Sequence, residues 1–121
     1  MKTIRLISSV LAAVFITAAC ASNEKEIYIP KDLQEMDLND PQSEYSYERM
    51  ALTENFAIFW EKGFGNDLSC APELEGQDMT IDLEKLKVKL EDFYQYFYKT
   101  LGFAKKGSKA DRYRMMVMLR Y

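Results

Sequence analysis

The apolar residues between positions 83 and 101 recur at the spacing of an α-helix. Thr80 or Asp82 supplies a side-chain oxygen to cap the start, and Gly102 supplies a left-handed residue to end it. The pattern therefore predicts one long helix with a buried apolar face. Its predicted core positions, which are three or four residues apart, are Leu83, Leu86, Leu90, Phe93, Phe97 and Leu101.

Two other segments alternate with the period of two residues that is typical of strands. Asn55 to Glu61 is aromatic and β-branched, and Gly63 and Gly65 predict a turn soon after it. Arg112 to Tyr121 has apolar residues on both sides between Met115 and Leu119, which indicates an interior strand covered on both faces. Ile27 to Ile29 is a third, short candidate.

These elements predict an α+β fold, in which a small partial sheet of two or three strands packs on one long aromatic-rich helix. So few strands leave an edge of the last strand, Arg112 to Tyr121, without a neighbour. The domain is therefore expected to be incomplete. Either further chain completes it, or the chain self-associates through this C-terminal strand.

Three tyrosines widen the aromatic band of the predicted helix: Tyr94, Tyr96 and Tyr98. One interpretation is packing at the edge of the core, since aromatic residues at helical spacing bury large apolar areas. The other is a platform that binds a glycan or a peptide. The sequence does not identify such a protein or glycan ligand.

The first 19 residues have the organisation of a secretory signal. Lys2 and Arg5 form a short basic region, and an uncharged apolar stretch from Leu6 to Ala19 follows and ends in small residues. The stretch is short for a membrane-spanning helix, which needs about 20 residues. Residues 1–19 are therefore predicted to be a signal peptide.

The residues Ala18, Ala19 and Cys20 resemble the lipobox of bacterial lipoproteins. In that family the cysteine thiol receives a diacylglycerol and becomes the mature N-terminus. Thr17 departs from the large aliphatic residue that is usual there. Ala19-Cys20-Ala21 also fits an ordinary signal-peptidase site, with cleavage after Ala21 and loss of the cysteine.

The lipobox resemblance implies that Cys20 is the site of lipid attachment and that the lipid is the membrane partner of the chain. Palmitate would label such a protein. Residues 20–43 are then a tether with an irregular lead-in, and residues 44–121 are the domain. The implied location is the cell envelope, at the outer membrane or on its periplasmic or surface face.

Charge is unevenly spread along the chain. Residues 24–84 contain 16 acids and 4 bases, whereas residues 85–121 contain 10 bases and 3 acids. Two oppositely charged parts that fold against each other explain this split. A nucleic-acid partner is not expected for an exported protein with a net charge of −3.

The residue types present limit the chemistry. The chain has no histidine, which excludes a Ser-His-Asp triad and an H-E-x-x-H zinc site. If Cys20 is acylated, Cys70 is an unpaired thiol in a loop. If Cys20 is kept without lipid, a Cys20–Cys70 disulfide is an alternative. Neither Glu91 with Asp92 nor Glu73 with Glu75 is tied to a cleft. We predict no catalytic residue, no metal site and no cofactor.

Four stretches resemble the amino-terminal part of a family of uncharacterised bacterial lipoproteins: Tyr47 to Met50, Glu54 to Gly65, Phe93 to Phe103 and Tyr113 to Tyr121. Their order is also similar to the start of zinc-peptidase-like (gluzincin-like) domains, in which the helix with the zinc ligands follows later. Two hypotheses result: a non-catalytic envelope lipoprotein with a structural or binding role, or the N-terminal fragment of a zinc-metallopeptidase-like secreted enzyme without its catalytic helix.

Overall fold

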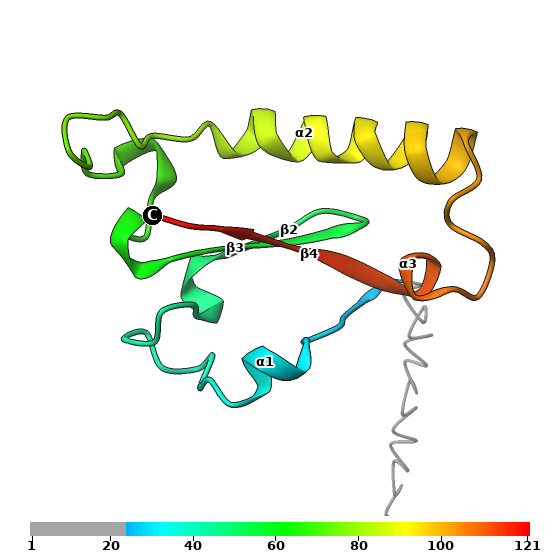
Figure 1. The fold of residues 1–121 in the computed structure, drawn as a ribbon, viewed down its shortest axis with the longest axis horizontal. Coiled ribbons are helices and arrows are strands. Elements are labelled where there is room, and N and C mark those ends of the chain that lie inside the picture. The colour runs from blue at the N-terminus through cyan, green and yellow to red at the C-terminus, as the bar shows by residue number, and fades with distance from the viewer. Residues whose placement is uncertain (1–23) are drawn as a thin grey trace, which may run out of the picture.

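The computed structural model describes residues 24–121, so the predicted signal segment and Cys20 lie outside the described part. The fold is α+β in three layers (Figure 1): α2 lies over one face of a sheet, and α1 with its neighbouring turns lies under the other. The sheet has four strands in the order β1-β4-β3-β2, not the two or three predicted. The strands are β1 (Glu26–Ile27), β2 (Met50–Leu52), β3 (Phe56–Trp60) and β4 (Tyr113–Leu119).

Helices and helical turns connect these strands. The α-helices are α1 (Lys31–Gln34), α2 (Leu83–Tyr94) and α3 (Lys109–Arg112). The π-helical segment η4 (Gln95–Thr100) continues α2 directly. Three short 3-10 turns complete the set: η1 (Tyr47–Arg49), η2 (Lys62–Phe64) and η3 (Leu68–Cys70).

β3 and β4 form the centre of the sheet, run parallel and pair Ile58 with Val117. Parallel neighbours need a long connection from the end of one strand to the start of the next, and α2 provides it. β2 pairs with β3 in the antiparallel sense through a tight turn, in which the Thr53 amide donates to the Phe56 carbonyl over 2.9 Å. The sequence pattern did not predict β2, because three residues are too few to show a period.

Both faces of the central strands are covered, as predicted for β4. Ile58 and Trp60 lie in an apolar cluster with Val117 and the inner face of α2. Ala57 and Phe59 lie in a second cluster on the opposite face, where the methionines of β4 pack. All five residues of β3 are buried, so the sheet has an apolar core on each side.

The lead-in segment before η1 belongs to this second cluster. Leu38 and Tyr45 are each 6% exposed and pack under the sheet. Arg49 is only 2% exposed, which is unusual for a charged side chain. The predicted strand at Ile27 to Ile29 is present in part, since β1 reaches Ile27.

The capping predictions for the long helix are confirmed, and so is the first half of its predicted core face, since Leu83, Leu86 and Leu90 pack against the core. The second half is not confirmed. Asp82 accepts a hydrogen bond from the Lys85 amide over 3.0 Å, and Gly102 has φ of 75°. Phe93 and Phe97 are 43% and 38% exposed, whereas Tyr94 is fully buried. Leu101 is 50% exposed, so the prediction that Phe93, Phe97 and Leu101 are core residues is wrong.

The physical reason is the phase of the buried stripe. Tyr94 follows Leu90 by four residues, just as Leu90 follows Leu86, so the stripe continues through Tyr94. Phe93 lies about 100° around the helix from Tyr94, on the outer flank. Residues 93–98 are nearly all aromatic, so the sequence pattern does not distinguish the buried rings from the exposed ones. Packing against the sheet selects which rings are buried.

The C-terminal end of β4 has partners on the side of β3 but no strand partner on its outer edge. The Tyr121 amide donates to Glu61 Oε2 over 2.7 Å, and the Tyr121 ring lies so close to Gly63 that a Cβ there would come within 2.3 Å of it. On the outer edge, β1 pairs only with Tyr113 and Arg114, and no later part of β4 has a strand partner there within residues 24–121. Self-association through this edge stays a prediction.

Candidate functional site

The main candidate site is a group of exposed apolar side chains where α2 continues into η4. These side chains are between 38% and 67% exposed. We call the group the aromatic end, and it consists of Phe93, Tyr96, Phe97, Leu101 and Phe103. Isolated exposed apolar residues are normal in proteins, but contiguous groups mark surfaces that bind something.

The backbone of η4 explains how so many aromatic residues reach the surface together. The Leu101 amide donates to the Tyr96 carbonyl over 3.0 Å, and the Thr100 hydroxyl donates to the Gln95 carbonyl over 3.1 Å. Bonds between residues five apart widen the last turns of the helix. Segments of this kind are frequent at functional sites. Gly102 then turns the chain, so that Phe103 returns towards the helix.

Three rings of the aromatic end, those of Phe93, Tyr96 and Phe97, belong to a series of ring contacts that reaches the core. Tyr94 is stacked on Tyr98 with 5.1 Å between ring centroids, and Tyr98 meets the edge of Phe93 at 6.0 Å. Phe93 and Phe97 lie 4.5 Å apart. At its inner end the series meets Phe56 of β3, which packs edge-on against Tyr94 at 6.2 Å. The exposed rings are thus supported by buried ones.

Lys25, near the beginning of the described residues, forms hydrogen bonds beside this site. Its ammonium group donates to the Tyr94 hydroxyl over 2.8 Å and to the Ala110 carbonyl over 3.0 Å. The same ammonium lies 4.5 Å from the centroid of the Tyr94 ring, within the range of a cation–π contact. The chain therefore enters the domain beside the base of the aromatic end.

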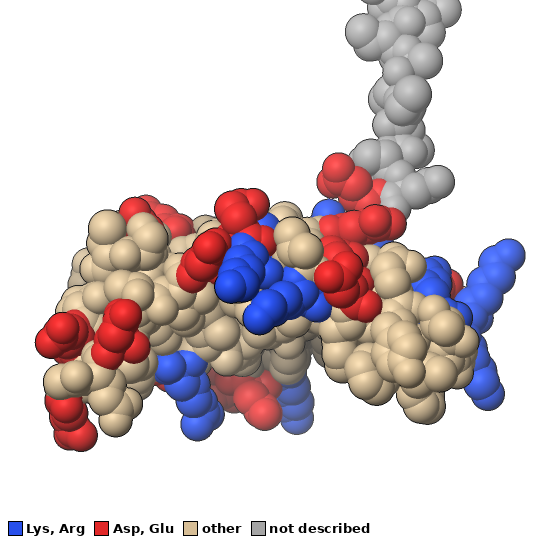
Figure 2. All heavy atoms as spheres, turned by 90° about the horizontal axis from the view of Figure 1, so that it is seen from above, with Lys and Arg blue, Asp and Glu red and all other residues tan. Residues whose placement is uncertain are grey.

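Lysines accompany the aromatic end along the chain. From residue 93 to residue 110 the sequence contains four lysines and no acid. One of them, Lys99, lies 5.7 Å from the Tyr94 ring centroid. Figure 2 shows a broad uncharged area at this end of the molecule, with Lys and Arg side chains projecting beyond it.

A polar network beside the aromatic end joins α2 to the β2–β3 turn. Glu91 Oε1 accepts from the Thr53 hydroxyl over 2.5 Å and from the Asn55 amide over 2.9 Å, and Oε2 accepts from the Asn55 side chain over 2.7 Å. Partial burial alone raises the pKa of Glu91. The hydrogen bonds from Thr53 and Asn55, together with the charge of Lys25, outweigh it and hold the pKa below the ordinary value of 4.5.

This network was not predicted. The sequence pattern drew attention to Glu91 only together with Asp92, and the structure separates them, because Asp92 is exposed while Glu91 bonds to the turn. The one feature of the sequence that could have indicated this role is that Glu91 directly follows Leu90, a residue of the buried side of the helix. Its partners lie 36 and 38 residues earlier in the sequence, so no local pattern reveals them.

We expect the Glu91→Gln variant to be less stable than the wild type at neutral pH by about 1–3 kcal/mol, the range for a lost hydrogen-bonding partner in a buried setting. Because folding lowers the pKa of Glu91, its contribution to stability is complete above the ordinary pKa. It is lost as pH falls through the folded pKa.

Urea unfolding measured from pH 7 down to pH 3 checks this expectation. The difference in stability between wild type and variant should shrink towards the acid end. Asp92→Asn serves as the control, because Asp92 is the exposed neighbour on the same helix. A constant difference between Glu91→Gln and wild type across this range would contradict the proposed role of the carboxylate charge.

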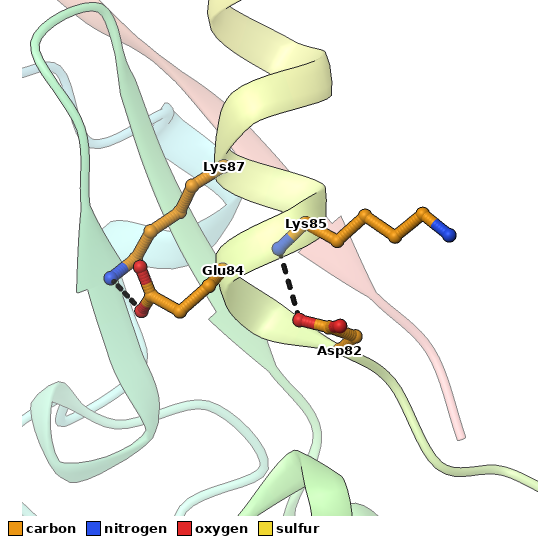
Figure 3. A network of polar contacts seen from close by, with 4 residues as sticks. All are labelled: Asp82, Glu84, Lys85 and Lys87. Atoms are coloured by element: carbon orange, nitrogen blue, oxygen red, sulfur yellow. Dashed lines mark hydrogen bonds and ion pairs between the residues drawn. The ribbon is translucent and has the colours of Figure 1, made fainter.

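A second candidate is an open hollow of about 710 Å³ between η3 and the start of α2, with acidic side chains at its rim. Each of these carboxylates already has a local partner. Asp67 accepts from Ser69, Asp82 caps the helix, and Glu84 pairs with Lys87 at 2.8 Å (Figure 3). The bonds from Ser69 lower the pKa of Asp67. The hollow therefore offers no free carboxylate pair for acid–base work.

The other residues considered from the sequence are not gathered into a site. Cys70 is an exposed free thiol at the end of η3. Glu73 and Glu75 lie on an exposed loop. In the described part of the chain, no three His, Cys, Asp or Glu side chains come together as metal ligands. Nor does any helix in residues 24–121 have the length and apolar character needed to cross a bilayer.

Fold and site together define a small α+β domain with a βαβ centre, an exposed aromatic end on its long helix and a chain entry beside it. The chain belongs to the family of unknown function DUF6055, whose model matches residues 19–121. Comparisons with curated proteins and with solved structures find no match. The resemblance to zinc-peptidase-like domains is not tested by these findings and stays a prediction.

Proposed function

We propose that this protein is a non-catalytic lipoprotein of the cell envelope, anchored through a lipid on Cys20 and serving a structural or binding role there. The observation that carries the proposal is the run of small residues ending at Cys20, directly after an uncharged apolar stretch. Several acyl chains hold a soluble domain firmly at a bilayer, since each buried CH₂ contributes about 0.8 kcal/mol.

The arrangement of the domain supports this proposal. Lys25, five residues after Cys20, is already fixed to Tyr94 and to the Ala110 carbonyl. An anchor at Cys20 would therefore hold the domain close to the membrane on a short tether. The proposed binding role rests on the aromatic end, which contains five of the ten large apolar residues that are exposed in residues 24–121.

We expect cells that express the wild type to incorporate labelled palmitate into the protein and cells that express Cys20→Ser to incorporate none. The reason is that only the Cys20 thiol can receive the diacylglycerol of the anchor. Label recovered in membranes and intact mass of the purified protein are the measurements. Cys70→Ser is the matched control and should keep the label, because it removes the other thiol of the chain. A wild type without label, with a mature N-terminus at Ser22, would show that the ordinary signal peptidase cleaves it.

A further inference from the structure

We infer that the aromatic end of α2 lies on an anionic membrane surface and so sets the orientation of the anchored domain. This inference rests on the proposed anchor at Cys20 and goes beyond it, because an anchor alone leaves a domain free to present any face. Three features of the molecule carry it: the length of the tether, the chemistry of the exposed side chains and the distribution of charge.

The tether between Cys20 and Lys25 is too short to let the domain move far from the membrane. A chain spans at most about 3.6 Å per residue, so Cys20 lies no more than about 18 Å from Lys25. Lys25 contacts Tyr94, which is stacked on Tyr98 beside Phe93. The start of α2 and the hollow beside it lie at the opposite end of a helix that Figure 1 shows running the length of the domain. An anchor at Cys20 thus lies at the same end of the domain as the aromatic end.

The exposed side chains suit the boundary between headgroups and acyl chains. Phenylalanine and leucine partition into the acyl region, whereas tyrosine places its ring there and keeps its hydroxyl in the headgroup layer. Phe97, Leu101 and Phe103 supply the first kind of contact, and Tyr96 supplies the second. These residues come from the end of one helix and the turn after it, so they are exposed at the same end of the domain.

The charges that accompany this group along the chain suit an anionic surface. Lys99, Lys105 and Lys106 flank the apolar residues along the chain, and no acid occurs from residue 93 to residue 110. Each lysine near an anionic leaflet adds attraction that falls off within a Debye length. The acids of the chain are concentrated before residue 85, and the rim of the hollow at the far end of α2 is acidic. A negatively charged surface therefore favours contact through the aromatic end.

The test compares two exposed leucines at opposite ends of the domain, Leu101 and Leu74, which are 50% and 38% exposed. In a Cys70→Ser background, Leu101→Cys or Leu74→Cys supplies the only reactive thiol, because an acylated Cys20 is a thioether. The lipidated protein is purified from membranes, labelled with the environment-sensitive dye NBD and reconstituted into vesicles of phosphatidylcholine with or without phosphatidylglycerol. Brominated acyl chains serve as quenchers.

We expect the label at residue 101 to shift to shorter emission wavelengths and to be quenched by the brominated lipid, more strongly with phosphatidylglycerol. The label at residue 74 should emit as in water. Replacing Lys99, Lys105 and Lys106 with glutamate should remove the difference between the two vesicles at residue 101. Equal signals at both positions, or quenching that does not depend on phosphatidylglycerol, would overturn the inference.

Three further outcomes distinguish membrane contact from protein contact and from loss of the anchor. A blue-shifted label at residue 101 that brominated lipid does not quench would place a second protein or a second copy of this chain on the aromatic end, and would overturn membrane contact. A protein that carries no palmitate and does not float with the vesicles would overturn the proposed anchor itself. A protein that carries palmitate and floats, with residue 101 in water, would overturn the orientation alone.

Discussion

Replacing Tyr94 by alanine is expected to unfold the domain or to bring it close to unfolding, whereas Phe93→Ala is expected to leave it folded. Truncating a fully buried aromatic side chain costs about 3–5 kcal/mol. Tyr94 is 0% exposed and also accepts the hydrogen bond from Lys25. A domain of this size has about 5–10 kcal/mol of stability in all. Phe93 is 43% exposed, and its truncation should cost only about 1 kcal/mol.

Thermal and urea unfolding of the two variants measure this difference. The pair is well matched, because the two residues are adjacent on one helix and similar in size. Tyr94→Phe removes only the hydroxyl and so measures its separate contribution to stability, which should be about 1 kcal/mol. Equal losses of stability in Phe93→Ala and Tyr94→Ala would contradict the assignment of the inner and outer sides of the helix. They would also remove the basis for treating Phe93 as part of an exposed site.

Replacing Arg49 by alanine is the second change with a large expected effect. The guanidinium is almost fully buried and donates to the carbonyls of Pro41, Ser43 and Glu44 over 2.9, 2.5 and 3.3 Å. Hydrogen bonds to a charged group contribute about 1.5–3 kcal/mol each, and part of this total offsets the cost of burying the charge. We expect a net loss of about 3 kcal/mol or more, because the variant leaves three carbonyls without this donor.

Two comparisons make the Arg49 result specific. Arg112→Ala removes an exposed arginine and should change stability by no more than about 0.5 kcal/mol. Arg49→Lys keeps the charge but cannot reach three carbonyls from one ammonium group, so it should recover only part of the loss. Hydrogen exchange should show the fastest opening at the Ser43 and Tyr47 amides, which bond within this segment. Uniform loss of protection across the sheet would contradict a local role for Arg49.

The Tyr94 prediction also bears on the proposed site. Tyr94 is the buried support beneath the exposed rings, and Lys25 joins it to the start of the domain. A variant that loosens Tyr94 should therefore weaken both the fold and the fixed position of the tether. The exposed aromatic residues can be changed with little effect on stability, which makes them suitable for tests of binding alone.

The amino-acid sequence by itself determined the features that depend on near neighbours along the chain. Strand β3, the cap at Asp82 and the end of the helix at Gly102 follow from local periodicity and from the chemistry of single residues. The two-sided apolar pattern of β4 likewise identified it as an interior strand. These features were predictable because each needs only the few residues around it.

Only the tertiary structure decided which aromatic residues are buried and which polar groups meet. The run from Phe93 to Phe97 offers an aromatic side chain on almost every side of the helix, so the packing of α2 on β3 selected Tyr94 for the core. Glu91 finds its partners more than 30 residues away, on a turn whose strand β2 is too short to be recognised. Contacts between distant segments depend on how the helix lies across the sheet, and no local pattern in the chain carries that information.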